Sequence, residues 1–257
     1  MTDPILPSWW RVLGSTALAA FLVIALEGLA LLTPPAVGLG VITGALALFA
    51  AALGSARARG LRGAIRLDGP VPSPGRLAPG MALVAFFVLS CLLLLREATK
   101  TIDIPMLSQI LGDRSLVNRL RLVGVIVLLG PIGEELVLRG WLQSQLERRW
   151  RPLAAVLGAA LVFGVMHGVD VRLGYFVALG AMFGAAAIAF RSLWAAIILH
   201  MSVNAMGAIP LLLGTGATPP AELASKAPSP WWGVAGVAIV LVAYPQWIRR
   251  VAAEARL

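Results

Sequence analysis

Hydrophobic residues in this chain form long uninterrupted runs that short polar stretches separate. Because apolar and polar positions do not alternate, the runs predict helices rather than the strands of a membrane barrel. A helix needs about 20 residues to cross a bilayer, and several runs are somewhat shorter. Eight spans are expected: Val12–Leu32, Val37–Leu53, Met81–Leu95, Leu122–Leu142, Leu153–His167, Leu173–Phe190, Leu193–Leu213 and Trp231–Ile248. The pattern predicts an all-α, polytopic membrane helical bundle of about eight transmembrane helices, as a single integral membrane domain over residues 1–257.

Composition agrees with this prediction. The chain is 59% hydrophobic and 13% charged, with a mean hydropathy of +0.88, which excludes an ordinary soluble domain. A net charge of +9 would suggest nucleic acid in a soluble protein. Here the arginines lie in loops, where topology and anionic lipid explain them, so we expect the lipid bilayer and no nucleic acid as partner. The single cysteine, Cys91, lies within an apolar run and leaves no intramolecular disulfide.

Charges in the loops predict the orientation of the bundle. The loop 54–79 carries five arginines against one acid, Asp68, so the positive-inside rule places it in the cytoplasm. Eight spans threaded from there put both termini inside, with thirteen basic residues inside and seven outside. The N-terminus has no basic stretch before its first apolar run, and that run is too long for a signal peptide. The first span is therefore expected to be a retained anchor.

Two polar features keep more than one interpretation. The segment 96–121 is amphipathic and of mixed charge, with an apolar centre at 104–111. It is expected either to lie in the membrane interface as a lid or gate or to be a plain connecting loop. Glu27 is a lone carboxylate in the first span. One interpretation is structural: the carboxyl group is neutral when buried, or it is directed toward the end of the span. The other is that Glu27 has a functional role.

Two carboxylates and an arginine interrupt the fourth span, in the stretch 130–139 that reads GPIGEELVLR. A charge at that depth costs about 2.5 kcal/mol or more, so such residues usually mark function. Glu135 and Arg139 stand at i and i+4 on one helix face and are expected to pair, while Glu134 points elsewhere. Pro131 predicts a kink that would place both glutamates in the first turn of a second half-helix. The alternative is a buried ion pair that only fixes helix register.

The two histidines of the chain lie in or at the end of apolar spans. His167 shares a helix face with Phe163, and His200 shares one with Asn204. Hydrocarbon offers these groups no partners, so we expect them to converge with the glutamates. At about 1.5 Å per residue, Glu134 and His200 lie about 12 and 10 Å from the inner edge of the membrane core, but His167 lies near 21 Å. The fifth span must therefore begin below that edge or tilt.

Three motifs of this chain resemble the signature motifs of the CPBP family of intramembrane proteases, the group that contains the CAAX prenyl endopeptidases and the bacteriocin-processing or immunity proteins. They are Glu134-Glu135-x-x-x-Arg139, Phe163-x-x-x-His167 and His200-x-x-x-Asn204. The resemblance covers about residues 122–207. It implies an endopeptidase that hydrolyses a peptide bond of a membrane-associated or lipid-linked polypeptide. It also fits a multi-pass protein of the bacterial cytoplasmic membrane with both termini in the cytoplasm.

The resemblance also implies roles for individual residues. Glu134 and His167 are expected to bind and activate a water, and His200 and Asn204 to stabilise the oxyanion. The remaining motif residues are expected to support them: Glu135, Arg139 and Phe163. No serine or cysteine is placed as a nucleophile, since Ser202 faces another side of its helix and Cys91 is remote in sequence. Direct attack by water is therefore expected.

A zinc site is the alternative for activating the water. Glu134, His167 and His200 are the residue types of a site with two histidines and one carboxylate. The histidines belong to different spans, however, and neither has a second histidine one turn away as in H-E-x-x-H. We therefore expect a glutamate mechanism without metal or other cofactor, with zinc as the alternative.

Two other functions remain as alternatives at this point. One is a proton-coupled transporter that uses the same carboxylate and histidines as a relay, although no internal repeat supports it. The other is a non-catalytic immunity or scaffold member of the same family. The sequence leaves open the cleavage site, any prenyl group on the substrate and the oligomeric state.

Overall fold

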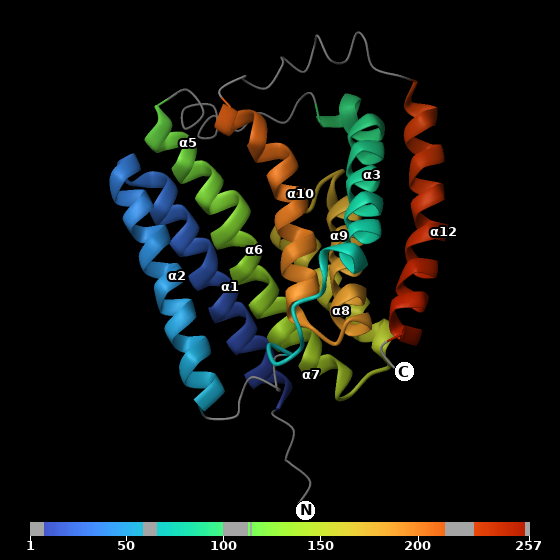
Figure 1. Cartoon of the computed structure of the whole chain (residues 1–257), viewed down its shortest axis with the longest axis horizontal. Coiled ribbons are helices and arrows are strands. Elements are labelled where there is room, and N and C mark those ends of the chain that lie inside the picture. Colours follow the sequence, from blue (N-terminus) through green and yellow to red (C-terminus); the bar gives the residue numbers. More distant parts are fainter. Residues whose placement is uncertain (1–7, 59–65, 100–112, 114, 214–228, 255–257) are drawn as a thin grey trace, which may run out of the picture.

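The computed structural model describes residues 8–58, 66–99, 113, 115–213 and 229–254, and these contain helices and turns but no strand. The helical segments in chain order are α1 (Trp9–Leu32), α2 (Pro35–Ala58), α3 (Pro74–Thr99), α5 (Leu116–Val123), η2 (Gly124–Leu129), α6 (Gly130–Glu135), η3 (Leu136–Gln143), α7 (Ser144–Glu147), α8 (Pro152–Met166), α9 (Leu173–Ala189), α10 (Leu193–Leu213) and α12 (Pro230–Glu254). Figure 1 shows them as one helical bundle. Each expected span overlaps a helix, which confirms the all-α membrane bundle.

Three helices are long and apolar enough to cross a membrane: α1, the part Pro74–Leu95 of α3, and α12. Four further apolar helices are shorter: Pro35–Ala51, Pro152–Met166, Leu173–Ala189 and Leu193–Ala208. Together they indicate an integral membrane protein. The interpretation of residues 1–257 as a single domain stays a prediction.

Five consecutive segments, α5 to α7, form one continuous helix over residues 116–147, called the central helix below. The backbone at its joins keeps right-handed helical angles, with φ −62° and ψ −52° at Leu129 and φ −67° and ψ −37° at Glu135. The second half-helix that a kink at Pro131 predicts is therefore absent from these residues, because the helix continues through the proline. The wider π-helical turns of η2 absorb the proline, because the Gly130 N–H donates to the carbonyl of Val125, five residues earlier. The glutamates thus lie inside a helix and not at its N-terminus.

Several chain segments that are distant in sequence meet at one end of the bundle. Trp9 packs against Trp150, Arg66 pairs with Glu147, and Arg76 pairs with Glu254 at 3.2 Å. One end of the bundle is therefore formed by four segments: the start of α1, the loop 66–73, the turn 148–151 and the end of α12 (Figure 1, bottom). This shared end is the one that the loop arginines predict to be cytoplasmic. Its orientation in a membrane stays a prediction.

The loop predicted at 54–79 is shorter in the structure. α2 continues to Ala58, and α3 begins at Pro74, so Pro79 lies inside a helix. Because Pro79 is in the second turn of α3, the hydrogen bond it removes belongs to the start of the helix, where the loss is least disruptive. The segment 96–121, which is a candidate gate, is helical at both ends: α3 continues to Thr99 and α5 begins at Leu116. Residues 100–112 and 114, and the gate interpretation with them, lie outside the described part of the chain.

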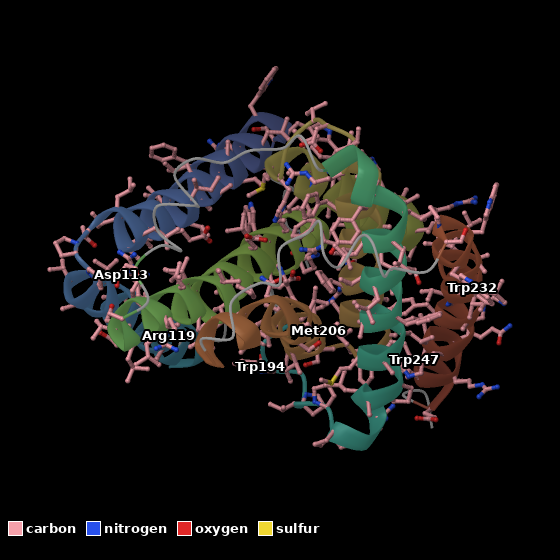
Figure 2. All side chains as sticks on the ribbon, turned by 90° about the horizontal axis from the view of Figure 1, so that it is seen from above. Asp113, Arg119, Trp194, Met206, Trp232 and Trp247 are labelled. Atoms are coloured by element: carbon pink, nitrogen blue, oxygen red, sulfur yellow. The ribbon has the colours of Figure 1, made fainter. Side chains whose placement is uncertain are left out.

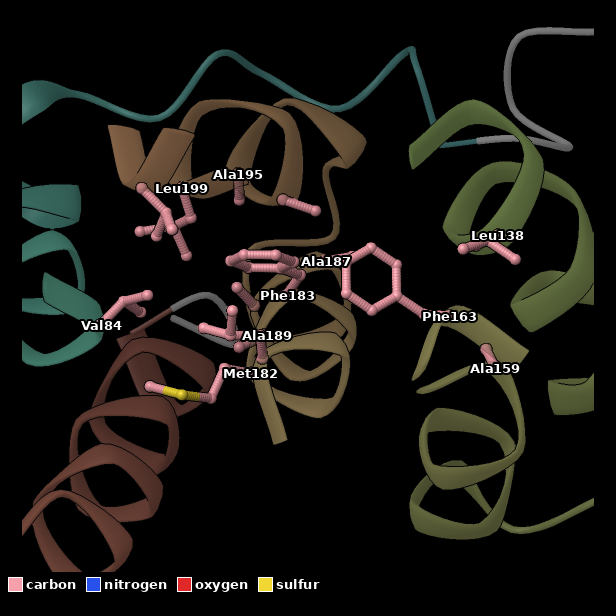
Figure 3. Close-up of a cluster of buried hydrophobic side chains, with 14 of the residues drawn as sticks. Val84, Leu138, Ala159, Phe163, Met182, Phe183, Ala187, Ala189, Ala195 and Leu199 are labelled. Carbon is pink, nitrogen blue, oxygen red and sulfur yellow. The ribbon is translucent and has the colours of Figure 1, made fainter. Parts of the chain in front are cut away.

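The core of the bundle lies where α8, α9 and α10 meet the central helix. Small residues permit the close approach, since a Cβ on Gly180 would lie 3.0 Å from the Cα of Ala160. Phe163 of α8 and Phe183 of α9 meet edge to face in this core, with Leu199 of α10 nearby (Figure 3). On the outer side, α12 packs along α3 with Trp247 between them, whereas Trp232 points away from the bundle (Figure 2).

Candidate functional site

Glu134 and His167 face one another across the central helix and the end of α8. Glu134 Oε2 lies 3.9 Å from His167 Nε2. The Glu134 side chain is 14% exposed and the His167 side chain is 27% exposed. The Oε2 atom is buried and has no hydrogen-bond partner within the described residues. His167 Nδ1 lies 2.9 Å from the carbonyl oxygen of Phe163. That carbonyl accepts only, so it fixes the proton on Nδ1 and leaves a lone pair on Nε2 toward the carboxylate.

Glu135 joins the central helix to α9 and α10 through a fully buried network. Its Oε1 atom accepts from Arg139 Nη1 at 2.8 Å and lies 2.9 Å from His200 Nδ1. Arg139 Nη2 donates to the carbonyl of Gly180 at 2.9 Å. Glu135 and Arg139 have no exposed side-chain surface. The pair that the i,i+4 spacing predicts is present, while the bond from His200 to Glu135 is one that the sequence motifs did not show.

Asn204 is held by the backbone of the central helix. Its Nδ2 atom donates to the carbonyl oxygen of Ile126 at 2.8 Å. The local sequence explains why this carbonyl is free: the Gly130 N–H bonds to Val125, and Pro131 has no N–H to offer. Asn204 supplies the missing donor. The proline thus leaves a carbonyl that fixes the Asn204 amide of α10 against the central helix.

Aromatic rings hold both imidazoles in place. The His167 ring lies 4.4 Å from the Phe163 and Phe176 rings, and the His200 ring is stacked on Phe183 at 4.7 Å. The Arg139 guanidinium lies over Phe163 at 4.8 Å, so this ring contacts the cation as well as both histidines. The contacts of the Phe163 ring with Arg139, His167 and His200 explain why an aromatic residue stands one turn before His167.

The depth mismatch expected for His167 has a simple cause. The central helix continues to Glu147, beyond the apolar edge at Leu142, so Glu134 lies about 20 Å above its inner end. His167 lies about 22 Å above the start of α8, which follows the same turn. α10 instead begins inside the bundle, where Ser192 and Leu193 are fully buried and the N–H of Leu193 donates to the backbone carbonyl oxygen of Arg66. The three motifs therefore meet at one level.

A polar turn follows His167 at the margin of the site. Gly168 has φ +117°, a left-handed conformation that glycine adopts without strain. Asp170 pairs with Arg172 at 2.7 Å. The side-chain hydrogen bond from Arg172, followed by its backbone N–H, lowers the pKa of Asp170 below its usual range. This exposed pair closes the turn between α8 and α9 on the side of the site.

Glu27 is a further acidic residue near the site, and the sequence motifs did not include it. Its Oε1 atom is buried without a hydrogen-bond partner in the described part of the chain. A Cβ on Gly130 would lie 3.1 Å from that oxygen, so Glu27 packs directly on the helical turn before Glu134. The clue in the sequence is Gly130 and Gly133, a small-residue face that lets α1 approach.

No three His, Cys, Asp or Glu side chains are grouped as a metal site among the described residues. Of the three residues that would hold zinc in the alternative mechanism, His200 uses Nδ1 on Glu135, which leaves only Nε2 for a metal. An apolar groove elsewhere, between α3, α8, α9 and α12, has no carboxylate or histidine in its described lining. The polar cluster around Glu134 is therefore the candidate for chemistry.

A family model described as type II CAAX prenyl endopeptidase, Rce1-like, matches residues 117–206. Residues 117–206 therefore resemble an Rce1-like domain. The family agrees with the one that the three motifs predict, and the matched segment contains the central helix, α8, α9 and most of α10. Comparisons with curated proteins and with solved structures give no match. The Rce1-like domain and the apolar helices together support an intramembrane endopeptidase in general terms.

Proposed function

We propose that this protein hydrolyses a peptide bond of a membrane-associated or lipid-linked polypeptide, with a water activated by Glu134 and His167. One observation carries the proposal: two hydrogen-bond acceptors face each other without a donor between them. Ionised Glu134 accepts at Oε2, and His167 accepts at Nε2 because its proton is on Nδ1. Across 3.9 Å, a water can donate one proton to each atom. Its lone pair is then free to attack a carbonyl carbon.

The proton balance of this reaction is simple. As water attacks the peptide carbonyl, Glu134 takes one of its protons and the carbonyl oxygen becomes an oxyanion. Glu134 then gives that proton to the departing amine as the carbon–nitrogen bond breaks. His167 fixes the second hydrogen of the water and so directs the attack. No covalent acyl-enzyme is formed.

His200 and Asn204 are the proposed donors to the oxyanion. Glu135 accepts from Arg139 and from His200 Nδ1, so His200 can donate from Nε2 only when its ring carries both protons. That state balances the site: the negative charges of Glu134 and Glu135 match the positive charges of Arg139 and His200. Asn204 uses one hydrogen of its amide on Ile126 and has a second for the oxyanion.

Comparative proteomics tests this function directly. Membranes from cells with the wild-type chain are compared with membranes from cells with the Glu134→Gln variant, and a polypeptide that accumulates in the variant is isolated. The purified wild-type protein in liposomes should cleave that polypeptide, and the variant should not. Absence of cleavage by the wild-type protein, with uptake of solute or protons instead, would contradict the proposal.

Metal removal should have little effect. We expect the purified protein to keep its activity within about twofold after dialysis against a chelator, since carboxylate and imidazole already activate the water. The measurement is peptidase activity together with the metal content of the active sample. Stoichiometric zinc, with activity lost on its removal and restored on its return, would replace this mechanism by one in which Glu134, His167 and His200 hold the metal.

The bundle end that contains the start of α1 and the end of α12 should face the cytoplasm. We expect a Ser73→Cys variant, in a Cys91→Ala background, to react with an impermeant thiol reagent only after the membrane is opened. A Val171→Cys variant in the turn between α8 and α9 is the control, and it should react in intact cells. Both positions are exposed. The reverse labelling pattern would show the opposite orientation.

A further inference from the structure

α1 lies outside the segment that matches the Rce1-like family, yet it contacts the central helix at the level of the site. The two helices run antiparallel, because Arg121 donates to the carbonyl of Leu31 at one end and Trp141 donates to Ser15 at the other. Figure 1 shows the same opposed directions. Between these contacts, Val23 packs on Gly133 and Glu27 on Gly130. The glycine face thus brings one acidic side chain of α1 beside the turn that precedes Glu134.

The geometry of the two helices turns the carboxyl groups toward each other. Helical side chains lean toward the N-terminus of their own helix. Since α1 and the central helix are antiparallel, the Glu27 side chain leans down toward Gly130 while the Glu134 side chain leans up toward the same turn. Each has a buried carboxyl oxygen without a partner in the described residues, Oε1 of Glu27 and Oε2 of Glu134.

Charge balance decides the protonation state of Glu27. The proposed reaction already places two carboxylates and two cations in the site, so a third carboxylate would be a net charge in a water-poor interior. No described cation pairs with Glu27, because none of the ion pairs among these residues includes it. A neutral carboxyl group has an O–H to donate, and the Glu134 carboxylate, on the next turn after Gly130, can accept it.

We propose that Glu27 is a positioning residue of the site, a neutral carboxyl that donates a hydrogen bond toward Glu134 and fixes how that carboxylate faces His167. The inference rests on the proposed function. Glu27 keeps its proton throughout, and the proton from the water goes to Glu134 as before. Gly130 is part of the arrangement, since any larger residue there would press on the Glu27 oxygen.

Two substitutions separate a hydrogen-bond donor from other roles. Glu27→Gln keeps a neutral donor of the same size, so kcat should stay within about threefold of wild type. Glu27→Leu removes the donor and should lower kcat about 10- to 100-fold with little change in KM, because a hydrogen bond to a charged group is lost. Thr16→Val is the matched control, since the Thr16 hydroxyl bonds only within α1 to the Val12 carbonyl. It should leave kcat unchanged.

Infrared difference spectroscopy on the purified full chain gives a readout that does not depend on turnover. The absorption of a protonated carboxyl group should be present in the wild type and lost in Glu27→Gln, which also decides the matter if Glu27→Leu fails to fold. A wild-type kcat in folded Glu27→Leu, equal damage by both substitutions, or no loss of absorption would overturn the proposal. If the wild-type protein cleaves no peptide, the proposed function fails instead, while the infrared comparison still tests the protonation of Glu27.

Discussion

Replacing Glu134 by glutamine should abolish turnover while leaving the fold intact. The substitution keeps the shape of the side chain but removes the base that takes the proton from water, a contribution of about 10²–10⁴ in rate. His167→Ala should have a similar effect, because the water loses its second acceptor. Activity of the purified variants in liposomes is the measurement, with thermal stability to show that they fold.

Two comparisons sharpen this prediction. Asn204→Ala should leave a trace of activity, since one oxyanion donor is worth about 10²–10³ in rate. Glu147→Gln is the matched control on the same helix: its carboxylate pairs with Arg66 at the end of the bundle and lies away from the site. It should turn over substrate at nearly the wild-type rate. A Glu134→Gln variant with more than a tenth of wild-type activity would contradict the role of Glu134.

Removing Arg139 should damage the protein as a whole. Arg139→Ala leaves the Glu135 carboxylate with His200 alone and the Gly180 carbonyl without its donor, and it opens space beside Phe163 and Phe183. Breaking one side of a buried pair typically costs about 3–5 kcal/mol. We therefore expect a large drop in yield and in melting temperature, together with loss of activity. Arg139→Lys should recover only part, because one ammonium group cannot reproduce the planar fork.

The control for this prediction is a pair at the margin of the bundle. Arg66 and Glu147 also form an ion pair, but their side chains are 25% and 15% exposed. Arg66→Ala should therefore cost far less than Arg139→Ala, since solvent screens the charge that is left behind. Melting temperatures of the two variants in the same detergent give the comparison. A folded, fully active Arg139→Ala would show that the network around Glu135 does not support the site.

Much of this arrangement could be predicted because hydrocarbon gives polar groups so few options. Glu134, His167 and His200 lie on separate helices, and only convergence provides each with a neighbour. The same reasoning could not assign the individual bonds. Glu135 contacts both Arg139 and His200, and Asn204 contacts Ile126, because these pairs depend on the rotation of each helix about its axis. Hydropathy does not report that rotation.

Two expectations failed for reasons of backbone geometry. Pro131 predicts a kink when the helix on either side is a regular α-helix, but a π-helical stretch removes the conflict and leaves one carbonyl for Asn204. The level of His167 was misplaced because the apolar edge at Leu142 is not the end of its helix. Glu27 stayed ambiguous for a third reason: its neighbour Gly130 is distant in sequence and has no side chain to suggest a contact.

The order of the helices along the chain also determines when the buried network can form during synthesis. α1 precedes the central helix, and it offers the Val23 contact to Gly133 and the Leu31 carbonyl to Arg121 as soon as that helix enters the membrane. The Gly180 carbonyl and His200 are synthesised later. Until α9 and α10 are inserted, Glu135 and Arg139 have only each other as polar partners in this network. The first contacts of the central helix are therefore those with α1 and α2, which precede it in the chain. It reaches its final charge pairing only when α10 has been inserted.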